Sequence, residues 1–94
     1  MDDETRGFIE KVIDGALETD LLGAVDWIRK EIPLSSVKDL TFGFQVGLIY
    51  GNCMGFISLA SHGHTTAEDL LSLEAMLKRR FPELLEKIKK QMDT

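Results

Sequence analysis

The chain has 94 residues, which is enough for one domain, residues 1–94, with a single hydrophobic core. A formal net charge of −5 argues against a nucleic-acid binder, and the single cysteine, Cys53, excludes an intrachain disulfide and a cysteine-rich zinc cluster. Because the first residues are acidic, unlike the basic start of a secretory signal, we expect a cytoplasmic protein.

Apolar side chains recur at helical spacing across residues 4–18 and predict an amphipathic helix. A second apolar stripe starts after a cap at Asp20 and stops at Pro33; its members are Leu21, Val25, Ile28 and Ile32. The apolar stripe of the first helix stays in helical register past the cap. Residues 4–32 are therefore compatible with one bent helix or with two.

Ser36 begins the next predicted helix, with Asp39 in the position of a capping-box acid, and only glycine interrupts the helical pattern before about residue 60. After a turn at 61–64, Thr65 or Thr66 caps a helix whose stripe is Leu70, Leu73, Leu77 and Phe81. Pro82 either starts a further helix or lies within a bent one over 66–93. With no alternating strand pattern, the sequence predicts an all-α bundle of four or five helices around a central apolar helix at about 36–60.

Gly43, Gly47, Gly51 and Gly55 recur every four residues in this central helix and therefore line one gently spiralling strip. Each glycine costs about 1 kcal/mol relative to alanine in a helix interior, so the four cost about 4 kcal/mol. A domain has only about 5–15 kcal/mol of stability to lose. We therefore expect the strip to admit the close approach of another backbone or of a flat ligand.

Residues 40–67 carry no formally charged side chain, so the central helix is apolar on all sides. The other predicted helices offer too few apolar stripes to cover it completely. We therefore expect a homo-oligomer, most simply a dimer, whose interface contains the four glycines. The alternative is a monomer in which the glycines admit large neighbours of the same chain, such as Trp27 or Phe81.

Three hypotheses about function follow. The first is a small homo-oligomeric module for protein interaction, without enzymatic activity. The second is a ligand-binding or enzymatic domain whose pocket contains Gln45, Tyr50 and Asn52, because buried amides need hydrogen-bond partners. The third is a small membrane protein that spans the bilayer with 40–60; the internal Gln45 and Asn52 and the absence of basic flanks make it the least favoured.

Specific chemistry is weakly indicated, and we expect no cofactor and no metal. His62 and His64 are interpreted as two exposed loop histidines, and Cys53 as an inert thiol in an apolar helix. The basic stretch 78–90 carries Lys78, Arg79, Arg80, Lys87, Lys89 and Lys90. It could dock an acidic protein partner, an anionic membrane surface, or the acidic N-terminal helices of its own chain.

Overall fold

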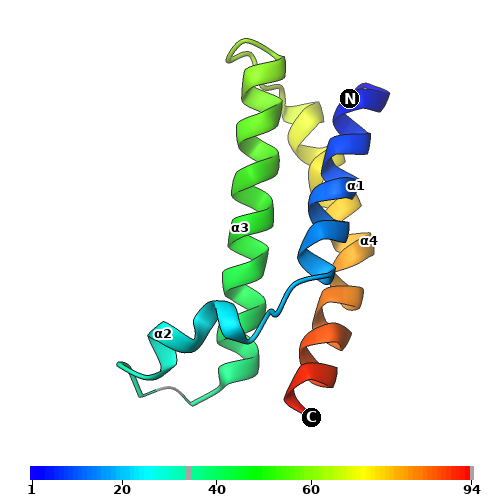
Figure 1. Ribbon diagram of the computed structural model, residues 1–94. Coiled ribbons are helices and arrows are strands. Elements are labelled where there is room, and N and C mark those ends of the chain that lie inside the picture. The colour runs from blue at the N-terminus through cyan, green and yellow to red at the C-terminus, as the bar shows by residue number, and fades with distance from the viewer. Residues whose placement is uncertain (34, 94) are drawn as a thin grey trace.

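The computed structural model describes residues 1–33 and 35–93. In this part of the chain, three long helices lie side by side, with one short helix and a 3₁₀ turn beside them, and there is no strand (Figure 1). The elements are α1 (Asp3–Leu17), η1 (Gly23–Val25), α2 (Asp26–Arg29), α3 (Val37–Ala60) and α4 (Ala67–Met92). The predicted all-α fold is therefore confirmed. The principal extents are 40 × 23 × 18 Å, and α3, about 36 Å long, spans nearly the longest of them.

Each long helix contributes one apolar stripe to a single core. The buried apolar residues at its centre are Ile9, Ile13, Ile49, Cys53, Ile57, Leu73, Leu77, Leu84 and Ile88. Two aromatic pairs join α3 to its neighbours. The Phe8 and Phe56 rings stack with centroids 4.0 Å apart, and Phe42 meets Phe81 edge-on at 5.9 Å. The core therefore holds one side of α3 firmly against α1 and α4.

The predicted helix ends are largely confirmed. The Ser36 hydroxyl accepts a hydrogen bond from the Asp39 N–H and caps α3, and Thr66 and Asp69 form a complete capping box at the start of α4. The turn at 61–64 also forms. Gly63 adopts φ 84° there, and its N–H donates to the Ser58 carbonyl at 2.7 Å, which closes the end of α3.

Residues 4–32 do not form one bent helix, and the second of the two expected helices is much shorter than the predicted 20–32. This segment contains only η1 and the four-residue α2. The Asp20 carboxylate accepts a hydrogen bond from the Gly23 N–H at 3.0 Å, and the Gln91 side chain accepts from the N–H groups of Leu21 and Leu22. Because these side chains take the N–H groups at the start of the segment, the chain turns there instead of continuing α1.

The two compatible interpretations of residues 66–93 are also resolved. α4 runs without interruption through Pro82. Proline lacks the N–H that would bond the carbonyl of Lys78, but both residues are exposed, so water can satisfy that carbonyl. The buried stripe continues through the proline, with Leu77 before it and Leu84 after it. Packing of that stripe therefore outweighs the lost helical bond.

Candidate functional site

α3 has two opposite faces. Its buried residues recur every four positions; they are Thr41, Gln45, Ile49, Cys53 and Ile57. Each of the four glycines follows a buried residue by two positions, which is a rotation of about 200° around the helix. The glycine strip therefore lies directly opposite the buried stripe, pointing away from α1 and α4. We call Gly43, Gly47, Gly51 and Gly55, with Leu40, Phe44 and Ser58 on the same side, the outward face of α3.

The glycine strip is open within the protomer. A methyl group added to any one of the four glycines would have no atom of another element within 4 Å. This excludes the alternative in which the glycines admit Trp27 or Phe81 of the same chain. The cost of the four glycines, about 4 kcal/mol, is therefore not offset by any contact inside the protomer.

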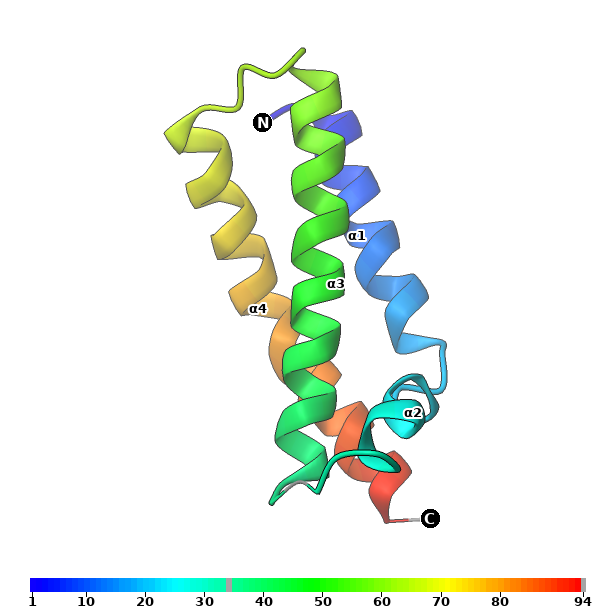
Figure 2. The same ribbon diagram turned by 90° about the vertical axis from the view of Figure 1, so that its left-hand side faces the viewer.

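Large apolar side chains lie exposed beside the glycine strip, and the outward face itself carries no charged residue. Leu48 and Tyr50 flank the strip on either side and are 48% and 37% exposed. Figure 2 shows α3 standing in front of α1 and α4, with only α2 and its connection beside its lower end. Trp27 of α2 is 66% exposed, and Ile32 in the connection after α2 is also exposed. Leu48, Tyr50, Trp27 and Ile32 are thus large apolar side chains that the protomer leaves exposed.

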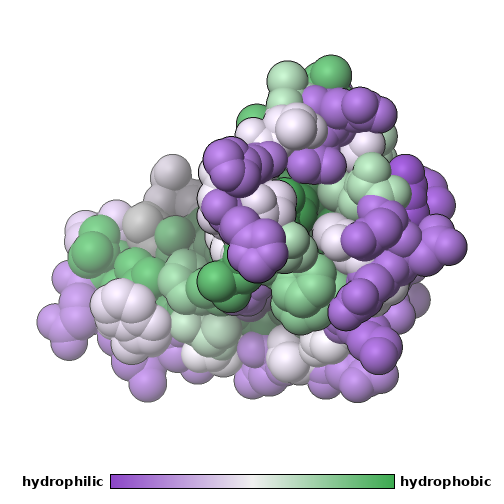
Figure 3. All heavy atoms as spheres, turned by 90° about the horizontal axis from the view of Figure 1, so that it is seen from above, coloured by the Kyte–Doolittle hydropathy of each residue, from purple (hydrophilic) through white to green (hydrophobic). Residues whose placement is uncertain are grey.

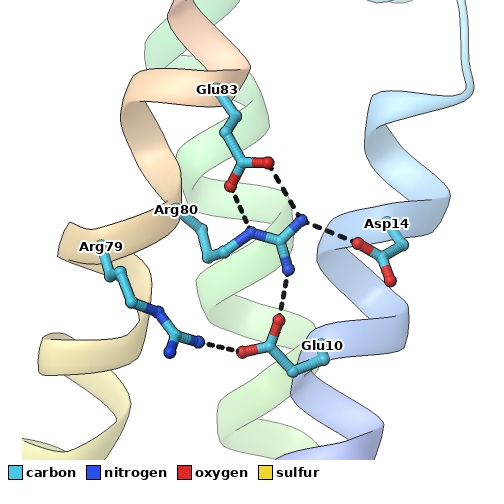
Figure 4. Close-up of polar contacts among 5 residues, drawn as sticks. All are labelled: Glu10, Asp14, Arg79, Arg80 and Glu83. Carbon is cyan, nitrogen blue, oxygen red and sulfur yellow. Dashed lines mark hydrogen bonds and ion pairs between the residues drawn. The ribbon is translucent and has the colours of Figure 1, made fainter.

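The charged residues gather elsewhere. Seen from above (Figure 3), strongly hydrophilic residues crowd the right-hand side, where Figure 1 places α1 and α4. An ion-pair cluster joins these two helices (Figure 4). The Arg80 guanidinium binds Glu10 and Asp14 of α1 and Glu83 of α4, with the Asp14 contact at 2.7 Å, and Arg79 also binds Glu10. The hydrogen bonds to Glu83 and then to Asp14 raise the pKa of Arg80 further above its ordinary value, so this cation stays charged.

Two of the six bases in the stretch 78–90 therefore dock onto the acidic N-terminal helix of the same chain, which is one of the three interpretations given above. Lys89 lies 3.6 Å from Glu86 on its own helix. An acidic protein partner for the remaining lysines stays a prediction.

The predicted ligand-binding residues lie on two different sides of α3. Gln45 and Asn52 line a groove of about 380 Å³ between α1 and α3. Its other lining residues are Val12, Gly15, Ala16, Thr19, Asp20, Ala24, Leu48 and Ile49. Tyr50 is not part of this lining and lies on the far side of the glycine strip. The structure thus brings together two of the three residues.

The remaining candidate groups lie apart from one another. His62 and His64 are exposed in the α3–α4 turn, and among the described residues no three His, Cys, Asp or Glu side chains gather as a metal site would require. Cys53 is fully buried, and burial raises the pKa of its thiol to about 11. Such a thiol is protonated at neutral pH, as expected for an inert core residue.

Sequence reasoning missed the role of Gln91. Its side-chain carbonyl accepts hydrogen bonds from Leu21 N–H at 3.0 Å and Leu22 N–H at 3.2 Å, and its amide donates to the Thr19 carbonyl at 3.1 Å. It fastens the lower end of the groove to α4. No local pattern could reveal contacts across about 70 residues. The small residues of the groove wall, Gly15, Ala16 and Ala24, carried no signal either.

Comparison of the chain with protein-family models, with curated proteins and with solved structures gives no match. In the described residues, one helix, Val37–Ala60, is long and apolar enough to cross a membrane by length and composition. Only 28% of its most apolar window is buried in the protomer. The geometry of α3 and its surroundings is therefore what points to a function.

Proposed function

We propose that this protein is a small cytoplasmic interaction module that self-associates, most simply as a two-fold dimer, through the outward face of α3. The observation that carries the proposal is the open glycine strip, opposite the buried stripe and without neighbours within 4 Å. A second copy of α3 could approach this strip more closely than any helix face with side chains allows. Close approach would bury the flanking Leu48 and Tyr50 and offset the cost of the glycines.

The charge distribution supports a second copy as the partner. The chain has a net charge of −5, so like charges would oppose most contacts between two copies. The outward face carries no charged residue, so this repulsion is weakest there. The ion pairs between α1 and α4 already hold the charged side of the protomer together.

A membrane-spanning α3 is the competing proposal, favoured by the length and composition of Val37–Ala60. Against it, α1 packs along α3 and carries Glu10 near its middle, paired with Arg79 and Arg80 of α4. Insertion of α3 with its neighbours attached would draw this cluster toward the hydrocarbon, at a large desolvation cost. Self-association in water therefore has the better support.

Sedimentation velocity at micromolar concentration tests the proposal. We expect the wild-type chain to sediment as a dimer and Gly47→Leu and Gly51→Leu to sediment as monomers. Gly7→Leu is the matched control, because Gly7 is an exposed helical glycine of α1 that is equally open. It should leave the assembly intact. Leucine also has the higher helix propensity, so the protomers of all three variants should stay folded.

A wild-type chain that is monomeric at these concentrations would contradict the proposal. So would a dimer that persists in both Gly47→Leu and Gly51→Leu, because the interface would then lie elsewhere. Flotation of the wild-type chain with lipid vesicles distinguishes self-association in water from a membrane-spanning α3. Stable flotation would favour membrane insertion, and a protein left in the aqueous fraction would favour self-association.

A further inference from the structure

The groove between α1 and α3 is a second feature that the fold itself does not explain. Its α3 wall runs from Leu48, beside the glycine strip, to Gln45 and Ile49 of the buried stripe on the far side of the helix. The segment around Asp20 closes its lower end. Small residues on the opposite wall, Gly15, Ala16 and Ala24, keep it open. Its volume of about 380 Å³ lies within the usual range for small-molecule sites.

Gln45 is the polar residue at the base of this groove. It belongs to the buried stripe of α3 and is only 5% exposed. Among the described residues it makes no side-chain hydrogen bond, yet no fully buried side-chain nitrogen or oxygen is left without a partner. The amide atoms of Gln45 therefore keep their remaining exposure toward the groove that the residue lines.

The neighbouring buried polar residue behaves differently. The Thr41 hydroxyl donates to the Val37 carbonyl of its own helix at 2.7 Å, so its polar group is satisfied locally. A leucine in place of Gln45 would fill the same stripe without the cost of a nearly buried amide that lacks a protein partner. Packing alone therefore gives no reason for glutamine at this position.

The other polar groups of the groove limit what it could hold. Asn52 lies two turns beyond Gln45 on α3, about 10 Å along the helix axis. No lysine, arginine or histidine lines the groove, so an anionic ligand would find no counter-charge. The one charged lining residue, Asp20, is engaged with the Gly23 N–H. The Thr19 hydroxyl donates to the Ala16 carbonyl, and the rest of the lining is apolar or small.

We propose that this groove binds a small uncharged heterocycle that presents a hydrogen-bond donor and an acceptor side by side, as the lactam and amidine edges of nucleobases do. The carboxamide of Gln45 has the matching acceptor and donor on one plane. The apolar body of the heterocycle packs between Val12 and Ile49, and Asn52 lies within reach of its far end. This proposal does not require self-association, although Leu48 both lines the groove and flanks the glycine strip.

Nuclear magnetic resonance titration with free adenine and free uracil tests it. At millimolar concentration at least one of the two should shift the side-chain amide resonances of Gln45 and Asn52 and the backbone resonances of Gly15 and Ala16. Benzoate, an apolar anion, should not shift them. Gln45→Leu should weaken binding about tenfold or more, because the paired hydrogen bonds are lost. Tyr50→Phe, on α3 but outside the groove, is the control and should bind as the wild type does.

Absence of shifts with both nucleobases would overturn the proposal. Shifts that map away from the groove, or an affinity unchanged in Gln45→Leu, would overturn it as well. Circular dichroism of Gln45→Leu should show an unchanged helix content. Repeating the titration with Gly47→Leu separates this proposal from self-association, because the groove should bind equally well in that variant whether or not the chain dimerises.

Discussion

The seam between α1 and α4 and the outward face of α3 lie on opposite sides of the core. At the seam, Arg80 binds carboxylates from both helices, and the apolar stripes beneath it are buried. The outward face has no charged group, and a Cβ added to any of its four glycines would have no neighbour within 4 Å. The seam is thus complete within a single chain. The glycines of the outward face, in contrast, lower the stability of α3 without a compensating contact inside the protomer. The difference indicates where a partner would add stability.

The largest expected effect sharpens the contrast between the two sides of α3. Ile49→Ala removes a side chain that is 2% exposed at the centre of the core. It should lower the free energy of unfolding by about 2–5 kcal/mol, through lost burial and the cavity left behind. Leu59→Ala, on the same helix but 79% exposed, should change it by less than about 0.5 kcal/mol. Urea denaturation at low protein concentration measures both, and equal losses would contradict an open outer side.

An effect of intermediate size is the loss of stability at alkaline pH that the buried Cys53 should cause. Burial raises the pKa of the Cys53 thiol from its ordinary value of 9.0 to about 11. Below pH 9.0 the thiol is protonated in the folded and unfolded chains alike, so its contribution to stability is fully present. As the pH rises from 9.0 to about 11, the unfolded chain ionises first, and roughly 2 kcal/mol of stability should be lost.

Cys53→Ala provides the control for that pH dependence, because the lysines also titrate in this range. Denaturation curves at several alkaline pH values should show a steeper decline for the wild-type chain than for the variant. Parallel declines in stability for the two chains would mean that the Cys53 thiol is accessible to water and is not buried in the core.

The smallest expected effect on stability comes from removing the ion pairs at the seam between α1 and α4. Arg80→Met removes three ion pairs while it keeps most of the apolar stem. It should lower stability by about 1 kcal/mol, and the loss should shrink in molar salt because several of the partners are exposed. Arg79→Met is the matched control, with one ion pair and a side chain that is 66% exposed. Thermal unfolding at two salt concentrations tests this, and a larger loss for Arg79→Met would contradict the central role of Arg80.

Local signals in the sequence predicted much of this fold. The caps at Ser36 and Thr66 fixed the starts of α3 and α4, because capping depends on residues within one turn. The position of the glycine strip also follows from sequence, since its four-residue step matches that of the buried stripe. Residues 20–32 could not be predicted, because their turn depends on Gln91 in α4. The groove was beyond prediction for a similar reason, since its second wall comes from α1.

The hydrogen bonds of Gln91 have a consequence for the order in which the molecule is built. A growing chain emerges from its N-terminal end, so α1 and α3 are available to pair before α4 has been made. The segment at 19–22 gains its anchor only when the last turns of α4 arrive. Until then, the lower end of the groove and the attached α2 have fewer constraints than in the finished molecule. The final turns of α4 therefore fix residues 19–22 in place only after the rest of the chain has been synthesised.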